Sequence, residues 1–163
     1  MVSRHRRWRT ALGALAITVL ACGPGENKAS EAHDDTDAKE GVEELSAFEL
    51  ENGIGPIKEA VVLGPLDPRL AAQGEQIFSG KCGACHKMKE KYVGPALGQV
   101  TQRRTPAYVM NMILDPEEMY ERHPVAQQLL AEHMTQMPNL GLTQDEARAV
   151  VEYLRSQAEP TSP

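Results

Sequence analysis

The sequence is short of aromatic residues and of cysteine. Aromatic side chains make up only 4% of its 163 residues, which is few for a domain that fills its core with side chains alone. We therefore expect something other than side chains to fill part of the core. Three cysteines are too few for a fold held together by disulfides, so each cysteine needs its own explanation. This length allows one modest domain with flanking segments.

The chain also lacks an excess of basic residues. Its formal net charge is −6, whereas a surface that binds nucleic acid normally shows a clustered basic excess, so we expect no nucleic-acid partner. The acidic residues are unevenly spread. Residues 23–52 hold ten acidic residues and two lysines, which predicts a flexible, solvated linker, while residues 53–163 hold 13 acidic and 11 basic residues, a net charge of only −2.

The N-terminus has the layout of a secretory signal. Residues 1–10 carry four arginines and no acidic residue, and residues 11–21 form an uncharged, mostly apolar run that is too short to span a bilayer. The run ends in Ala21-Cys22, which resembles the cleavage box of bacterial lipoproteins. That resemblance implies that residues 1–21 are removed and that the new N-terminal Cys22 is lipidated. An ordinary signal peptide that contains a cysteine is the alternative.

The remainder of the chain predicts an all-α fold. No alternation of polar and apolar residues is long enough to predict a strand, and apolar residues recur instead at helical spacing. Prolines, three of them directly after an Asp or Thr that can cap a helix, mark where helices begin. The four helices predicted in this way begin at Pro68, Pro106, Pro116 and Pro124.

A capping box at Thr143–Glu146 predicts a further, C-terminal helix. We expect Gly80 to end the first helix. Residues 53–66 are apolar but interrupted by Gly and Pro, so we expect them to wrap over the domain surface in extended form. The chain is therefore divided into a signal peptide (1–21), a lipid-anchored acidic flexible linker (22–52), an extended lead-in segment (53–66), the folded domain (67–158) and a disordered tail (159–163).

Two of the three cysteines belong to the run Cys82-Gly83-Ala84-Cys85-His86. The pattern C-x-x-C-H is typical of covalent haem attachment, because two thiols three positions apart on a short turn can reach the vinyl groups of neighbouring pyrroles. His86 then lies under the iron as its proximal ligand. A zinc site would need two more ligands, and a thioredoxin-like redox pair, which normally follows a strand, would leave Cys82 and Cys85 as free thiols. We predict one covalently attached haem c.

Further motifs accompany this run along residues 67–155. A glycine and an aromatic residue precede it, a Gly-Pro-x-Leu motif follows it, a Met-Pro pair comes later, and an aromatic residue lies in the last helix. These residues are Gly74 and Phe78, Gly94-Pro95-Ala96-Leu97, Met137-Pro138, and Tyr153 with Leu154. In this order they resemble a class I cytochrome c.

The resemblance implies three to five helices packed around one haem, whose porphyrin would supply the missing apolar core. It also implies that the carbonyl of Pro95 accepts a hydrogen bond from the second ring nitrogen of His86, which would fix the orientation of the imidazole and raise its basicity.

For the distal side of the iron the sequence offers several candidates. Met137 is favoured, because a thioether is a neutral, polarisable ligand and Pro138 ends any helix before it, so that a loop can present the sulfur. Met134 is the next candidate, and His133 or His123 would give bis-histidine ligation. Three further methionines lie in or beside helical stripes and are expected to serve packing: Met110, Met112 and Met119.

Polar and charged residues surround the haem motif. Tyr92, Arg103 and Arg104 are candidates for contacts to the haem propionates, although a solvated loop would have the same composition. Four lysines cluster around the C-x-x-C-H run and either steer acidic partners or form a solvated charged face. These are Lys81, Lys87, Lys89 and Lys91.

These expectations favour an electron carrier over an enzyme. With His86 and Met137 as axial ligands the iron has no open position, so we expect outer-sphere one-electron transfer in a respiratory chain. The alternative is a monohaem enzyme or sensor whose open or labile distal position binds peroxide or nitric oxide. Residues 53–153 also resemble small lipoprotein cytochromes that accompany periplasmic reductases such as nitrous-oxide reductase. This implies a membrane-anchored protein on the periplasmic side of the cell envelope, with a quinol-oxidising complex and a terminal reductase or oxidase as partners.

Overall fold

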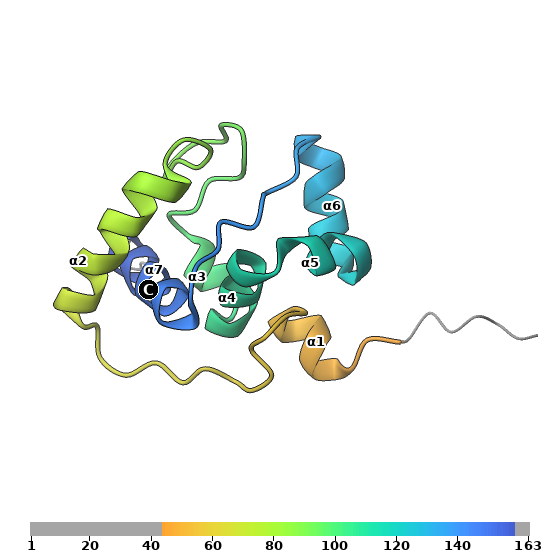
Figure 1. Cartoon of the computed structure of the whole chain (residues 1–163), viewed down its shortest axis with the longest axis horizontal. Coiled ribbons are helices and arrows are strands. Elements are labelled where there is room, and N and C mark those ends of the chain that lie inside the picture. The colour runs from red at the N-terminus through yellow and green to blue at the C-terminus, as the bar shows by residue number, and fades with distance from the viewer. Residues whose placement is uncertain (1–43, 159–163) are drawn as a thin grey trace, which may run out of the picture. The chain divides into compact units, whose positions relative to one another are not determined.

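The computed structural model describes residues 44–158 (Figure 1), so the expected signal peptide, Cys22, most of the acidic linker and the tail lie outside the described residues. Within residues 44–158 the chain forms seven α-helices and one π-helical turn and has no strand, which confirms the all-α class. None of these helices is both long and apolar enough to cross a membrane. The elements are α1 (Ala47–Asn52), α2 (Pro68–Ile77), η1 (Phe78–Cys82), α3 (Val100–Arg103), α4 (Pro106–Leu114), α5 (Pro116–Arg122), α6 (Pro124–His133) and α7 (Gln144–Gln157).

The predicted helix starts agree with the structure because their capping side chains accept the hydrogen bonds expected of them. Asp67 accepts from the amides of Arg69 and Leu70, and Thr105 accepts from that of Tyr108. Asp115 caps α5 in the same way, and the capping box predicted at the start of α7 is present. The expected three to five helices were too few for residues 44–158, since the short helices α1 and α3 carry no proline at their start.

The prediction that Gly80 ends the first helix is wrong. The helix continues as the π-helical turn η1, in which the amide of Gly83 donates to the carbonyl of Phe78, five residues earlier, at 2.8 Å. A Cβ at Gly80 would meet no atom within 4 Å, so no close approach requires this glycine. The wider turn keeps both Phe78 and Cys82 buried on the core side of the helix.

Residues 47–52, which were expected to end the flexible linker, form α1 instead. Ser46 begins this helix with a capping box: its hydroxyl accepts from the amide of Glu49 at 3.2 Å, and the Glu49 carboxylate accepts from the amide of Ser46 at 3.0 Å. The helix was not predicted because Glu49, which completes the capping box, was counted as one of the acidic residues of a linker.

Residues 53–66 contain no helix or strand, as expected, and connect α1 to α2 (Figure 1). Their first part does more than cover the surface, because Ile54 is fully buried. Asn111 on α4, also fully buried, holds this part: its amide nitrogen donates to the carbonyls of Asn52 and Ile57 at 3.0 and 3.1 Å, and its oxygen accepts from the amide of Ile57 at 2.9 Å. The buried side-chain amide of Asn111 thus satisfies backbone groups that a neighbouring strand would otherwise pair.

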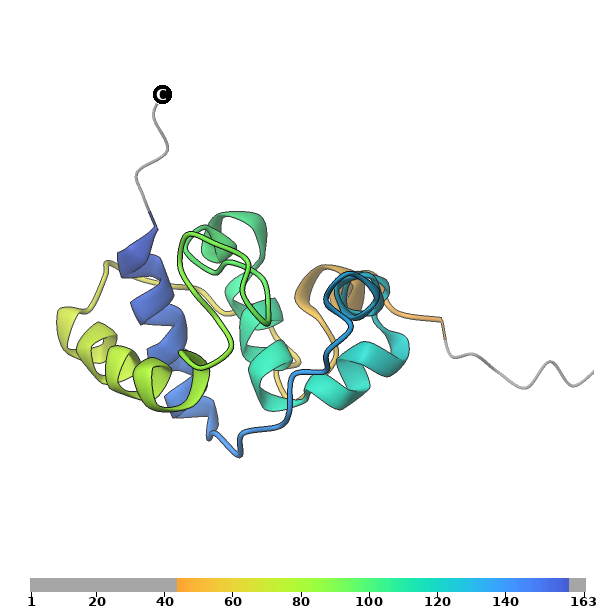
Figure 2. The ribbon, with the colours of Figure 1, turned by 90° about the horizontal axis from the view of Figure 1, so that it is seen from above.

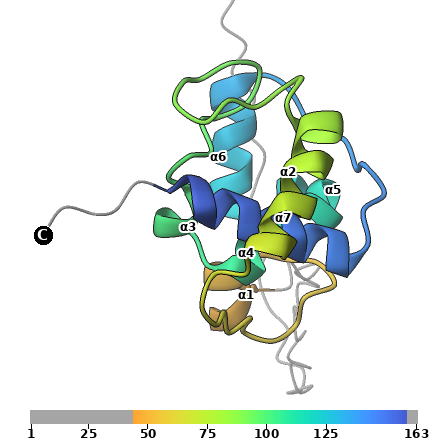
Figure 3. The same ribbon diagram turned by 90° about the vertical axis from the view of Figure 1, so that its left-hand side faces the viewer.

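α2 and α7 cross in close contact (Figure 3). A Cβ at Gly74 would lie 2.0 Å from the carbonyl oxygen of Ala149, so only glycine permits this approach. The rings of Phe78 and Tyr153 pack beside the crossing with centroids 5.3 Å apart. In the view from above (Figure 2), α4 separates this helix pair from α5 and α6.

His123, between α5 and α6, is fully buried although it carries a titratable ring. Its Nδ1 accepts from the amide of Val125 at 3.2 Å, which requires a lone pair, and its Nε2–H therefore donates to the carbonyl of Leu50 in α1, also at 3.2 Å. The ring stands edge-on to Tyr108, with centroids 5.2 Å apart. Both bonds together require the neutral imidazole, and burial, helped by the nearby Arg104, lowers the pKa of His123.

We expect Gly74→Ala to reduce the free energy of unfolding by about 3 kcal/mol, because the added methyl group would push the α2 and α7 backbones apart. Gly80→Ala is the matched control in the same continuous helix and should change it by less than about 1 kcal/mol. Denaturant unfolding of the haem-loaded protein measures both variants. Equal stabilities of the two variants would contradict this account of the crossing.

We also expect a pH dependence from His123. Because its pKa is lower in the folded than in the unfolded chain, the protein gains stability from the neutral ring above the ordinary histidine pKa of about 6.5 and loses it as the pH falls toward the folded-state pKa. The unfolding free energy measured at about pH 7.5 and about pH 5 should therefore fall more in the wild type than in His123→Gln. The same fall in both proteins would show that folding does not lower the pKa of His123.

Candidate functional site

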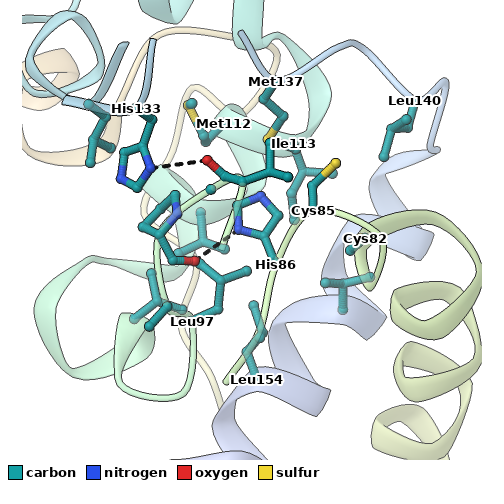
Figure 4. Close-up of a pocket in the computed structure, with 18 of the residues that line it drawn as sticks. Cys82, Cys85, His86, Leu97, Met112, Ile113, His133, Met137, Leu140 and Leu154 are labelled. Atoms are coloured by element: carbon teal, nitrogen blue, oxygen red, sulfur yellow. Dashed lines mark hydrogen bonds between the residues drawn. The ribbon is translucent and has the colours of Figure 1, made fainter. Parts of the chain in front are cut away.

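The C-x-x-C-H turn borders an apolar cavity of about 270 Å³ (Figure 4). Side chains from η1, α3, α4, α5, α6 and α7 line this cavity, together with the loop after η1 and the segment between α6 and α7. Its walls therefore combine residues that are far apart in the sequence, such as Cys82, Met137 and Leu154. We call the wall formed by the loop after η1 the proximal wall and the one formed by the segment before α7 the distal wall.

On the proximal wall a tight turn brings both cysteines and His86 to the cavity. The amides of Cys85 and His86 both donate to the carbonyl of Cys82, at 3.0 and 2.9 Å. Cys82 is buried and Cys85 is exposed, and burial raises the pKa of the Cys82 thiol. A buried thiol with a raised pKa is unlike the acidic thiolate of a thioredoxin-like pair. Among residues 44–158 no group of three or more His, Cys, Asp or Glu side chains could hold a metal ion, so a zinc site has no support there.

The ring of His86 has the hydrogen bond to Pro95 that the resemblance to class I cytochromes c implies. Its Nδ1 lies 3.0 Å from the carbonyl oxygen of Pro95, an atom that can only accept, so Nδ1 carries the hydrogen and Nε2 the lone pair. Burial lowers the pKa of His86, which favours this neutral form. A Cβ at Gly94 would lie 2.5 Å from Cε1 of the ring, which explains a glycine before Pro95. A neutral imidazole with a fixed tautomer is the form that coordinates a metal.

On the distal wall, Met137 enters the cavity from the segment between α6 and α7 (Figure 4). Met134 does not line the cavity: it is the C-cap of α6, with a left-handed φ of 53°, and its side chain is 85% exposed. His123 does not line it either, and its two ring nitrogens are bonded elsewhere. The structure thus separates Met137 from two of its three competitors.

His133, the third competitor, does line the cavity. Its side chain is only 4% exposed, and its Nδ1 lies 3.2 Å from the carbonyl oxygen of Val93 on the proximal wall (Figure 4). Its Nε2 is 3.8 Å from the carboxylate of Glu132, an exposed side chain. Its Nδ1 is therefore bonded to the proximal wall, and the imidazole joins α6 to that wall. Its role at the rim was not predicted from the sequence.

The residues assigned to packing fall into two groups. Met110 and Met119 are buried between helices, as expected, whereas Met112 lines the cavity. Tyr108, on the same helix, also lines the cavity, and its buried hydroxyl has no hydrogen-bond partner. The sequence did not predict that Met112 and Tyr108 line the cavity, because helical spacing does not distinguish a side chain that faces a core from one that faces a cofactor.

Arg103 and Arg104 line the cavity near Tyr108, and the Arg104 guanidinium lies 5.1 Å from the centroid of the Tyr108 ring. Tyr92, by contrast, is 57% exposed and does not line the cavity; its ring lies below the amine of Lys87. Two cations at the lining of an apolar cavity fit the carboxylates of haem, and the apolar remainder fits its ring. The residues present therefore fit a haem group.

The lysines around the turn are partly engaged with the fold. Lys81 and Lys87 donate to the carbonyls of Leu140 and Gly83, at 3.1 and 2.9 Å, and Lys91 donates to that of Glu132 at 3.3 Å. Lys81 also lines the cavity. The contact of Lys81 joins η1 to the distal wall, and that of Lys91 joins the loop after η1 to α6.

Known proteins with the same features were found in two of three comparisons. Residues 71–158 match the family model described as cytochrome c. A solved cytochrome c from Rhodothermus marinus is 45% identical, with a TM-score of 0.65, and the match covers 69% of this chain and 97% of that one. An engineered form of that protein, Rma TDE, matches at 45% identity with a TM-score of 0.64, covering 68% of this chain and 96% of that one. Rma TDE bound to a carbene intermediate matches with the same identity and coverage and a TM-score of 0.62.

No curated protein gave a match. The family match covers the C-x-x-C-H turn, both walls of the cavity and the crossing of α2 and α7. Taken with the all-α fold and the fit of the cavity to haem, it shows that the chain belongs to the cytochrome c family, whose members are electron carriers with a covalently attached c-type haem.

Proposed function

We propose that this cytochrome c is a one-electron carrier with a six-coordinate haem iron. Cys82 and Cys85 form the thioether bonds, His86 is the proximal ligand and Met137 the distal ligand. The observation that carries the proposal is that Nε2 of His86 and the thioether of Met137 reach one apolar cavity from different segments of the chain, with the cysteines at its edge. When bound, the haem supplies the iron whose ferric and ferrous states carry the electron.

The protein side of this function is orientation and exclusion of water. The hydrogen bond to Pro95 holds the ring of His86 and its tautomer, while the neutral thioether of Met137 favours the reduced iron and so raises its potential. The apolar side chains around the cavity limit the reorganisation that accompanies a change of charge. Arg103 and Arg104 would hold the carboxylates of the group. No residue is needed as an acid, base or nucleophile.

We further propose that the carrier is anchored on the periplasmic side of a bacterial membrane through lipidated Cys22. Support comes from the signal-like residues 1–21 and from the acidic segment that separates Cys22 from the folded unit. An acidic tether would keep the domain soluble and within reach of partners on one membrane face. A quinol-oxidising complex as donor and a terminal reductase or oxidase as acceptor are the partners that such a position favours.

The ligation is tested by the visible spectrum. We expect the ferric wild type to show the weak far-red band of a sulfur ligand, and Met137→Ala to lose it and to bind carbon monoxide when reduced at neutral pH. Met134→Ala, whose side chain is exposed on the same segment, is the matched control and should keep the band. Carbon monoxide binding by the reduced wild type would instead favour the enzyme or sensor with an open distal position.

The anchor is tested by the mature N-terminus. When the full-length chain is expressed in a bacterium that processes lipoproteins, we expect mass spectrometry to show that the mature protein begins at Cys22 and that this cysteine carries acyl chains. The wild type should then partition with membranes, and Cys22→Ser should move to the soluble fraction, since Ser offers no thiol for lipidation. Equal partitioning of both proteins would contradict the anchor and leave the haem assignment untouched.

A further inference from the structure

The distal methionine lies in a segment with few backbone contacts. Between the end of α6 and Thr143, the cap of α7, the chain forms no helix or strand. Pro138 has no N–H, so the amide of Met137 is the one main-chain donor of the Met-Pro pair. This amide donates to the phenol oxygen of Tyr120 at 2.9 Å. A side chain from α5 therefore holds the backbone of the proposed ligand itself.

Between the end of α6 and α7, the other hydrogen bonds to this segment lie beyond Pro138. The side chain of Asn139 donates to the carbonyl of Leu114 at 3.0 Å, and Lys81 donates to the carbonyl of Leu140 at 3.1 Å. On the other side, Met134 closes α6 in its left-handed conformation with its side chain in solvent. The bond to Tyr120 is thus placed where it acts most directly on the position of the Met137 thioether.

Tyr120 is well placed to hold its partner because α5 is anchored on its other side. The neighbouring Met119 is fully buried, and its sulfur accepts from the amide of Ile54 in the lead-in segment at 3.1 Å. The Tyr120 ring packs against the buried cluster that contains Ile54 and Met119, while also lining the haem cavity. An aromatic ring with two rotatable bonds, packed in this way, presents its oxygen at a defined place.

We propose that Tyr120 is the positioning residue for the distal ligand. Its phenol oxygen accepts a hydrogen bond from the Met137 amide and so holds the thioether toward the iron. This limits the fraction of protein molecules in which the distal position is open. The inference deepens the proposed function and rests on Met137 as distal ligand. Removing the bond would leave a half-buried amide without a partner and favour displacement of the segment, so ligands from solution would compete better for the iron.

The test compares haem-loaded wild type, Tyr120→Phe and Tyr153→Phe. Tyr153 is the matched control, because it loses a hydroxyl on α7 that does not line the cavity. Titration of the ferric proteins with imidazole, followed by loss of the far-red band, should show an affinity about threefold to tenfold higher for Tyr120→Phe, the range expected for one hydrogen bond. Tyr153→Phe should stay within about twofold of the wild type.

Two further readouts separate positioning from a general loss of stability. The reduction potential of Tyr120→Phe should fall below that of the wild type, because a looser thioether favours the ferrous iron less. Amide hydrogen exchange in the reduced wild type should be slow at Met137 and faster in Tyr120→Phe. Rapid exchange at Met137 in the wild type would overturn the inference even if Tyr120→Phe did not fold.

The outcomes distinguish the inference from the proposal beneath it. A ferric wild type without the far-red band overturns the ligation by Met137, and the inference with it. A wild-type band that Met137→Ala loses, combined with imidazole affinity and potential in Tyr120→Phe equal to those of the wild type, overturns the role of Tyr120 and leaves the ligation intact.

Discussion

The close crossing of α2 and α7 determines where both walls of the haem cavity stand. α2 continues through η1 to Cys82, so its position places the C-x-x-C-H turn, and α7 begins shortly after the segment that carries Met137. The absence of a side chain at Gly74 is what allows these helices to meet. A covalently held haem then supplies the apolar volume that this aromatic-poor sequence does not supply itself.

The parts of the fold that were predictable are those encoded over a few residues. Caps and prolines fix helix starts within one turn, and C-x-x-C-H is complete in five positions, so the starts of α2, α4, α5, α6 and α7 and the proximal residues could be read from the sequence. α1 is also encoded locally, by the capping box of Ser46 and Glu49, but it lies at the end of an acidic segment whose composition is typical of a linker.

What could not be predicted depends on which segments the topology brings together. Asn111 binds Ile57 of the lead-in segment, which lies 54 positions earlier in the chain. Tyr120 binds Met137, which lies 17 positions later. Helical spacing identifies such residues as inward-facing but gives no partner. The same limit applies to Tyr108, which lines the cavity from α4.

The anchorage of the lead-in segment on α4 also has a mechanical consequence. Any force that reached the domain along the chain ahead of residue 44 would act first on α1, which is bound through His123 and, at its end, through Asn111. Only after those bonds had yielded would the load pass to α2 and the turn that carries Cys82 and Cys85. The N-terminal part of the folded unit would thus protect the C-x-x-C-H turn from a force applied ahead of residue 44.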